Sequence, residues 1–183
     1  MSGEVIEMKL RLFSIVPVLA ALTGGCSPSF EADLPDVEIT QHGLKMAGVP
    51  GAAQVGDTSV TSSFTFSSSA WAKHMNSAVF VHQVTITAGG SLANLDFIKS
   101  ARVTAAAAPA LSEGTTAIVD YERSADAPSS AAIQVSLPVP IDLTSLWSAN
   151  QLVIELQVAG QLPEQDWTVD LTLNLSGNMT YKF

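Results

Sequence analysis

The sequence predicts an all-β fold: a single antiparallel β-sandwich of about eight strands with one to three short helical turns, preceded by a helical leader. Three observations support this prediction. Apolar residues recur at every second position through most of the chain, which is typical of strands with one buried face. Glycine and proline separate these runs where turns are needed. No long stretch has the spacing of an amphipathic helix.

Composition indicates one folded domain and disfavours several classes of function. The chain has 183 residues, 47% hydrophobic and 14% charged, which is typical of one folded domain. Its formal charge of -9 disfavours nucleic-acid binding, because that binding requires an excess of lysine and arginine. The single cysteine allows neither an internal disulfide nor a cysteine-clustered zinc site.

The leader consists of two basic residues, Lys9 and Arg11, followed by the largely apolar run 12–22. A membrane-spanning helix needs about 20 apolar residues, so this run is too short to be one. It has the dimensions of a secretory signal, with a charged start, a brief apolar centre and small residues at its end. The residues before Met8 include two acids and do not fit such a start, so we expect translation to begin at Met8. The predicted signal peptide is residues 1–25.

The leader ends in Leu-Thr-Gly-Gly-Cys, residues 22–26. This motif resembles that of bacterial lipoproteins, whose signal ends in a leucine, two small residues and a cysteine. The resemblance implies that cleavage follows Gly25 and that Cys26 becomes a lipidated N-terminus, the target of palmitate labelling. The family usually has leucine three positions before the cysteine, where this chain has Thr23. Cleavage by the ordinary signal peptidase, giving a secreted or periplasmic protein, is therefore the alternative.

Lipidation would also determine where the protein is held. Each buried methylene contributes about 0.8 kcal/mol, so two or three acyl chains anchor a protein stably. From Cys26 onward the chain has six basic and fifteen acidic residues, so anionic headgroups repel the body and the anchor alone must hold it. The resemblance therefore implies a location in the bacterial cell envelope, with the outer membrane as the expected site.

A tether is expected to follow the anchor. Residues 26–35 combine the cysteine with prolines, serines and acids, a composition typical of a flexible linker. The acidic cluster of Glu31, Asp33, Asp36 and Glu38 lacks the spacing and the glycine of a calcium-binding loop, so no metal site is predicted there.

The sandwich domain is expected over residues 36–183, which contain eight alternating runs. The last run is the most regular, because a polar residue occupies every intervening position. The apolar positions of the runs are Val37 and Ile39; Val60, Phe64 and Phe66; Val84 and Ile86; Ala101, Val103 and Ala105; Ala117, Val119 and Tyr121; Ile133, Val135 and Leu137; Leu152, Ile154, Leu156 and Val158; and Trp167, Val169, Leu171, Leu173 and Leu175.

Three short segments have helical rather than strand spacing: 70–75, 94–99 and 142–147. In the third, Asp142 or Thr144 is expected to cap the turn. One alternative architecture remains open. The alternation continues to Phe183, which resembles the closing strand of a small outer-membrane β-barrel, although only 7% of the residues are aromatic and such barrels need aromatic girdles.

Residues suited to catalysis are sparse. His42, His74 and His82 lack the neighbours in sequence that would indicate a zinc site, so they are interpreted as structural or surface residues. No nucleophile elbow or phosphate-binding loop is present in the sequence. We therefore predict no catalytic residue, no metal and no cofactor. The three tryptophans, Trp71, Trp147 and Trp167, are expected to pack in the core.

The sequence thus predicts a lipid-anchored cell-envelope protein whose acidic β-sandwich is a non-enzymatic binding, assembly or structural module. The expected partners are the membrane, through the anchor, and an envelope protein or glycan, but not nucleic acid. The alternative function is a secreted hydrolase, because a catalytic triad or carboxylate pair can assemble from residues far apart in sequence.

Overall fold

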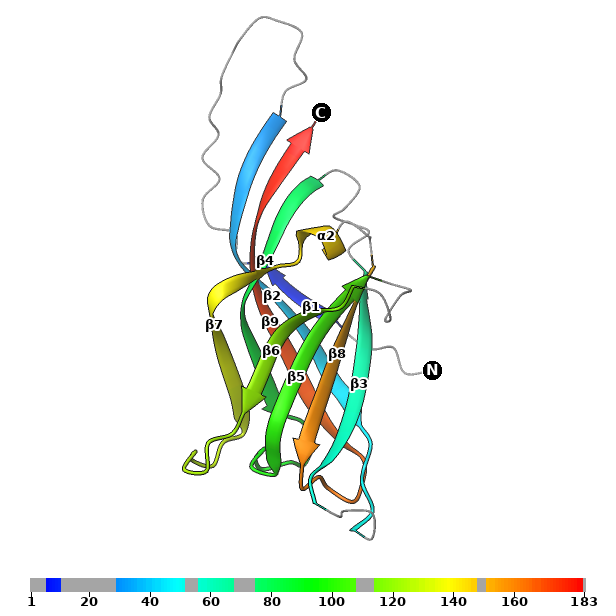
Figure 1. The fold of residues 1–183 in the computed structure, drawn as a ribbon. Helices are drawn as coiled ribbons and strands as arrows, with labels where there is room; N and C mark the ends of the chain where they lie inside the picture. The colour runs from blue at the N-terminus through cyan, green and yellow to red at the C-terminus, as the bar shows by residue number, and fades with distance from the viewer. Residues whose placement is uncertain are drawn as a thin grey trace, which may run out of the picture.

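A computed structural model of the chain confirms the all-β prediction (Figure 1). The structure describes residues 6–10, 29–51, 56–67, 75–107, 114–147 and 151–182, and their side chains over 37–51, 56–66, 78–107, 114–146 and 151–177. The elements in these ranges are β1 (Ile6–Leu10), β2 (Ser29–Met46), β3 (Thr58–Ser67), β4 (Met75–Ala88), β5 (Ile98–Ala107), β6 (Thr116–Glu122), β7 (Ala132–Asp142), α2 (Thr144–Trp147), β8 (Gln151–Gly160) and β9 (Trp167–Lys182).

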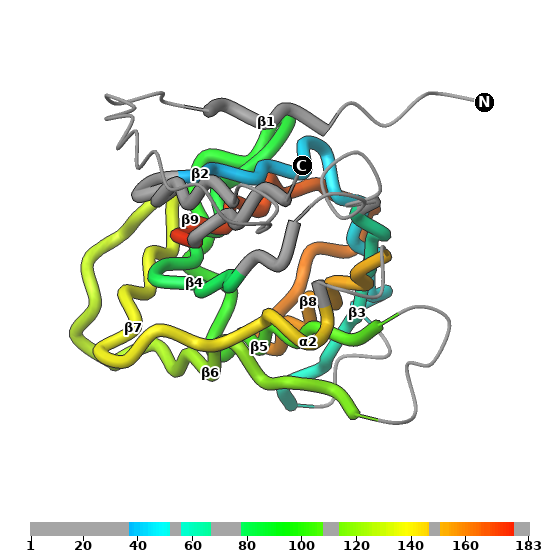
Figure 2. Tube along the Cα trace, turned by 90° about the horizontal axis from the view of Figure 1, so that it is seen from above, coloured from blue at the N-terminus to red at the C-terminus, as the bar shows by residue number. Residues whose placement is uncertain are grey.

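The strands form two antiparallel sheets that face each other (Figure 2). The five-stranded sheet has the order β1-β2-β9-β4-β7, and the four-stranded sheet has the order β3-β8-β5-β6. Eight of these strands, β2 to β9, belong to the predicted sandwich domain, in agreement with the predicted number. The described strands form two separate sheets and not the single closed sheet that the alternative architecture requires.

The core lies between the sheets and is built by the predicted alternation. Every second residue of β8 and β9 is buried, from Leu152 to Val158 and from Trp167 to Leu175, as the sequence predicts. Phe64, Phe66 and Val103 belong to the same sheet as β8 and face β9 across this core. Each large apolar side chain that is fully buried contributes about 1.5–3 kcal/mol, so this interior provides most of the driving force for folding.

Strand β6 departs from the predicted pattern. The sequence suggested that Ala117 and Val119 share the buried face, but Ala117 is exposed while Ile118 and Val119 are both buried. The reason is a β-bulge opposite β5: Val103 pairs with Val119 and Thr104 with Ala117, which leaves Ile118 without a partner position. A bulge adds one residue to one strand and so reverses the alternation beyond it.

The predicted helical turns have different outcomes. Helix α2 lies in 142–147 and is capped as predicted, because Asp142 Oδ1 accepts a hydrogen bond from the Thr144 amide at 2.8 Å. Hydrogen bonds from Thr144 also lower the pKa of Asp142. Segment 94–99 is a hydrogen-bonded turn and not a helix, because β5 already begins at Ile98. The segment 70–74 lies outside the described residues.

The N-terminal part of the chain contains more strand than the sequence suggested. Strand β2 begins at Ser29, inside the expected tether 26–35, and its first residues pair with 177–182 of β9. The end of β9 thereby gains partners for its backbone groups. Residues 6–10, part of the expected leader, form β1 beside β2. The predicted leader helix, 12–22, lies outside the described residues.

Gly160 offers a test of the packing between β8 and the turn before β5. Its φ of +153° disfavours any side chain, and a Cβ atom there would collide with the Phe97 carbonyl oxygen. We expect Gly160→Ala to lower the free energy of unfolding by about 1–3 kcal/mol, measured by urea denaturation. Gly114→Ala is the control, because Gly114 has a positive φ but open space around it. Equal losses in the two variants would contradict the predicted collision.

Candidate functional site

The two site residues that the sequence predicts, Gly25 and Cys26, lie outside the described residues, so lipidation and cleavage remain predictions. The polar groups that the fold itself brings together lie in two places. One is the outer face of the five-stranded sheet, and the other is a pair of loops at the end of the sandwich opposite the start of β2 (Figure 1).

Side chains on the outer face form rows that cross the five-stranded sheet. Thr172 of β9 is in register with Thr40 of β2 and Thr85 of β4, and the hydroxyls of Thr40 and Thr172 are 3.0 Å apart. In the next row, the Asn174 amide donates to Gln83 Oε1 at 2.9 Å, and Gln83 donates to a serine of β7 at 3.3 Å. These uncharged groups hold one another in place across strands, as cross-strand pairs do in other sheets.

A second polar group surrounds a β-bulge in β2. The pairing with β9 shifts between Gln41 and Leu44, so His42 and Gly43 project from the ladder. On the outer side, Asp170 accepts a hydrogen bond from the Gly43 amide at 2.8 Å, and its other oxygen lies 2.8 Å from His42 Nδ1. On the inner side, the buried Gln41 amide donates to the His42 carbonyl at 3.1 Å. Asp170 and Gln41 thus satisfy backbone groups that the bulge removes from the ladder.

A similar arrangement occurs on β4. The pairing of β4 with both neighbours shifts between Val81 and Gln83, which turns His82 outward. His82 Nε2 then makes a hydrogen bond with the Ser176 hydroxyl of β9. Both exposed histidines therefore owe their positions to bulges, which commonly redirect side chains in this way.

These contacts do not combine into a hydrolytic triad. In a triad one histidine bridges the nucleophile and the acid. Here His82 contacts the serine, whereas His42 contacts the carboxylate. Ser176 and Asp170 are six residues apart on the same strand, which corresponds to about 20 Å. Among the described residues, no group of three or more histidine, cysteine or acidic side chains has the arrangement of a metal site. His74 lies outside the described residues.

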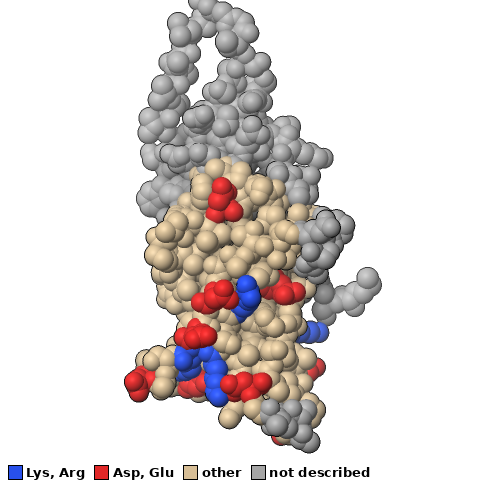
Figure 3. Space-filling model, viewed as in Figure 1, with Lys and Arg blue, Asp and Glu red and all other residues tan. Residues whose placement is uncertain are grey.

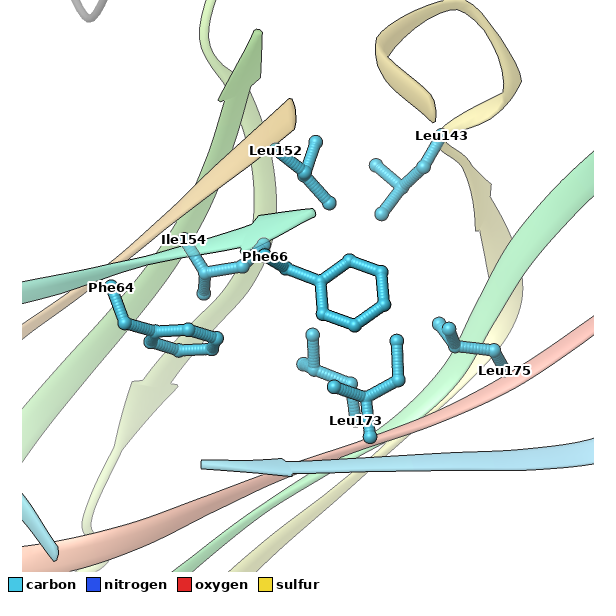
Figure 4. A pocket seen from close by; sticks show the side chains of 8 residues that line it. Phe64, Phe66, Leu143, Leu152, Ile154, Leu173 and Leu175 are labelled. Carbon is cyan, nitrogen blue, oxygen red and sulfur yellow. The ribbon is translucent and has the colours of Figure 1, made fainter. Parts of the chain in front are cut away.

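An apolar cavity of about 10 Å³ lies between the sheets, near the end of the sandwich where α2 sits (Figure 4). Eight side chains from both sheets and from the segment before α2 line it: Ile39, Phe64, Phe66, Leu143, Leu152, Ile154, Leu173 and Leu175. Its size is about that of one water molecule, and a cavity without polar groups stays dry. The cavity therefore provides nothing that would orient a polar substrate.

Among the described residues, Asp96 and Arg123 form the centre of a hydrogen-bonded cluster in these loops. Arg123 donates from Nη2 to Asp96 Oδ1 and to the Pro128 carbonyl, both at 2.7 Å. The Ser129 hydroxyl and the Ser130 amide donate to the same Asp96 carboxylate. Ser129, the Ser130 amide and the Arg123 charge lower the pKa of Asp96. These contacts tie the turn before β5 to the loop between β6 and β7.

Some charged side chains elsewhere form surface ion pairs. On the face shown in Figure 3, acidic and basic side chains lie next to one another mainly over the lower half of the described body. The pairs include Lys99 with Asp57 at 2.7 Å and Arg102 with Asp120 at 3.3 Å. Exposed pairs of this kind contribute only about 0–1 kcal/mol each, so they favour solubility more than stability.

The prediction of core packing for tryptophan is confirmed for Trp167. Its ring is buried and meets Phe97 edge to face, with centroids 5.1 Å apart and an interplanar angle of 88°. The side chains of Trp71 and Trp147 lie outside the described part of the structure. The interpretation of His42 and His82 as surface residues agrees with their exposure.

Neither a known protein family nor a curated protein matches the sequence. Within the described residues, no helix is long and apolar enough to cross a membrane. Function therefore has to be inferred from the chain itself.

Acid should weaken the loop network around Asp96. The pKa of Asp96 is lowered by folding, so its contribution to stability is present above its unfolded pKa of about 3.9 and is lost as pH falls through the folded pKa. We expect Asp96→Asn to be less stable than the wild type at pH 7 and the difference to shrink in strong acid, measured by urea denaturation at pH 7 and at about pH 2.5. Asp120→Asn, which removes an exposed ion pair, is the control. A difference that does not depend on pH would contradict this assignment.

The cavity gives a second test. Leu173→Ala would enlarge it, and we expect the free energy of unfolding to fall by about 2–5 kcal/mol. An enlarged dry cavity should also bind xenon, detectable as anomalous scattering in a crystal under xenon pressure. Val139→Ala is the matched control, because Val139 is 70% exposed and its loss should change stability by less than about 0.5 kcal/mol. Similar losses in the two variants would show that Leu173 is not a core residue.

Proposed function

We propose that this protein is a lipid-anchored component of the bacterial cell envelope and that its acidic β-sandwich is a non-enzymatic binding, assembly or structural module. One observation carries the proposal: a basic start at Lys9 and Arg11, a short apolar run, and then Cys26, the only cysteine in the chain. A cysteine kept for packing has no reason to stand at the end of a signal, whereas a lipid-modified cysteine must stand there.

The body supports this proposal by being able to fold without the cysteine. The described core consists of aliphatic and aromatic side chains between Val37 and Leu175 and needs no disulfide. A domain of about 150 residues buries roughly 68–70% of its unfolded surface, which suffices for independent stability. The thiol of Cys26 is therefore not required by the sandwich.

The position of the anchor relative to the fold suggests how the body is held. Strand β2 starts three residues after Cys26, a distance that an extended chain spans in about 10 Å. The end of the sandwich that contains Ser29 and Lys182 therefore lies next to the bilayer. The loops that carry Asp96 and Arg123 are at the opposite end and face away from the membrane (Figure 1).

A non-enzymatic role is supported by what the described polar contacts do. Asp170 and Gln41 stabilise a bulge, and Asp96 joins two loops. Each of these groups satisfies backbone or side-chain partners of the fold itself. The serine and the carboxylate that contact histidines belong to different pairs, so the alternative hydrolase gains no support from them.

Cys26→Ala tests the anchor. We expect the variant to lose metabolic labelling by a palmitate analogue and to accumulate as the uncleaved precursor, because the lipoprotein pathway requires the thiol. Ser27→Ala is the control and should be labelled and fractionate with membranes like the wild type. Labelling and membrane fractionation that are unchanged in Cys26→Ala would refute the proposal. Normal cleavage with release of a soluble protein, in both wild type and variant, would identify the ordinary signal peptidase instead.

A further inference from the structure

The outer edge of β2 carries a strand from the leader. Residues 6–10 pair antiparallel with Val37–Gln41, from Ile6 opposite Gln41 to Leu10 opposite Val37. This stretch of β2 is regular and lies between two irregularities of its pairing with β9, one at Leu34/Val37 and one at Gln41/Leu44. The edge of β2 thus offers five residues of undistorted strand, and β1 occupies all five.

The paired strand matches β2 in pattern as well as in length. Residues directly opposite in an antiparallel pair lie on the same face of the sheet. The register places positions 6, 8 and 10, which are isoleucine, methionine and leucine, opposite the core-facing positions of β2. It also places Lys9 opposite the exposed Glu38. A strand that fits this edge therefore has apolar residues at alternate positions and a basic residue between two of them.

The opposite edge of the same sheet has a different character. Strand β7 contains Pro138 and Pro140, and its pairing with β4 skips from Ile141 to Ser136. Prolines and a distorted ladder protect an edge against the addition of further strands. The segment Val37–Gln41 contains no proline, and its apolar residues Val37 and Ile39 are buried in the core between the sheets.

We propose that Val37–Gln41 is a strand-binding site of the mature protein, which residues 6–10 fill in this structure and an extended segment of a partner protein fills once residues 1–25 are removed. This inference rests on the proposed removal of residues 1–25, which would leave β2 at the edge of the sheet with unpaired backbone groups. Strand addition of this kind obtains affinity from backbone hydrogen bonds and specificity from alternate side chains.

The charge on the edge distinguishes a partner strand from a second copy of this chain. Two copies paired symmetrically about Ile39 would place Glu38 opposite Thr40, which gives no opposite-charge pair. A strand like the leader places a basic residue opposite Glu38, and such pairs contribute about 0.2–1 kcal/mol. The preferred occupant is therefore an extended peptide with alternating apolar residues and a central lysine or arginine.

The test uses the processed chain, residues 27–183, which retains β2 to β9 and the whole described core. The probe is a synthetic peptide with the sequence of residues 5–12. We expect saturating peptide to slow amide hydrogen exchange in Val37–Gln41 by roughly tenfold or more at the residues whose amides point outward, measured by NMR. The full chain with its leader retained should show the same protection without added peptide.

Peptide variants make the test specific without altering the protein. Met8→Asp in the peptide puts a charge opposite Ile39 and should abolish the protection, whereas Lys9→Glu should weaken binding several-fold. Glu7→Gln is the matched control and should bind like the parent peptide. If the processed chain does not give the spectrum of a folded protein, the full chain with Met8→Pro replaces it, and protection should be lost in the same five residues of β2.

Three outcomes would overturn the inference: unchanged exchange with every peptide, equal binding of all variants, or protection that rises with protein concentration alone, which would identify a second copy as the occupant. The chain used carries no lipid, so the result does not depend on whether Cys26 is acylated. Failure here and failure of palmitate labelling in cells can therefore be told apart.

Discussion

The structure depends above all on the register of β9 in the five-stranded sheet. This strand pairs with β2 on one side and with β4 on the other, and its alternate residues from Trp167 to Leu175 form the floor of the core. A shift of one residue would turn these side chains to solvent and the polar residues between them inward. The same alternation in β8, from the facing sheet, completes the apolar interior.

The polar contacts on the outer face follow from interruptions of that register. A bulge frees backbone groups, and the chain provides partners for them from both sides of the sheet, Asp170 outside and Gln41 inside. The two exposed histidines lie at such bulges. Their contacts with Asp170 and Ser176 are therefore consequences of how the sheet is bent, and this accounts for them without a catalytic role.

The two proposals concern the same end of the chain. Removal of the leader would attach the lipid close to the start of β2 and, in the same step, uncover the edge where β1 lies. Exposed edges are prone to aggregation, so an edge that processing uncovers needs a partner strand.

Local sequence determined the fold class, the approximate number of strands, the buried faces of β8 and β9, and the Asp142 cap of α2. It also determined the predicted leader and Cys26, whose signal lies within a few consecutive residues. These features depend on spacings of two to four residues, which the chain displays directly.

Only the tertiary structure decided the bulges, the pairing of His42 with Asp170 across 128 positions, the contact of Arg123 with Asp96, and the extension of β2 back to Ser29. A bulge at Ile118 reverses the alternation of β6. The bulge arises from the pairing of β6 with β5, so the sequence of β6 alone does not indicate it. Alternation specifies which residues share a face, but partners across a sheet are set by register, and register is a property of two strands that the sequence keeps far apart.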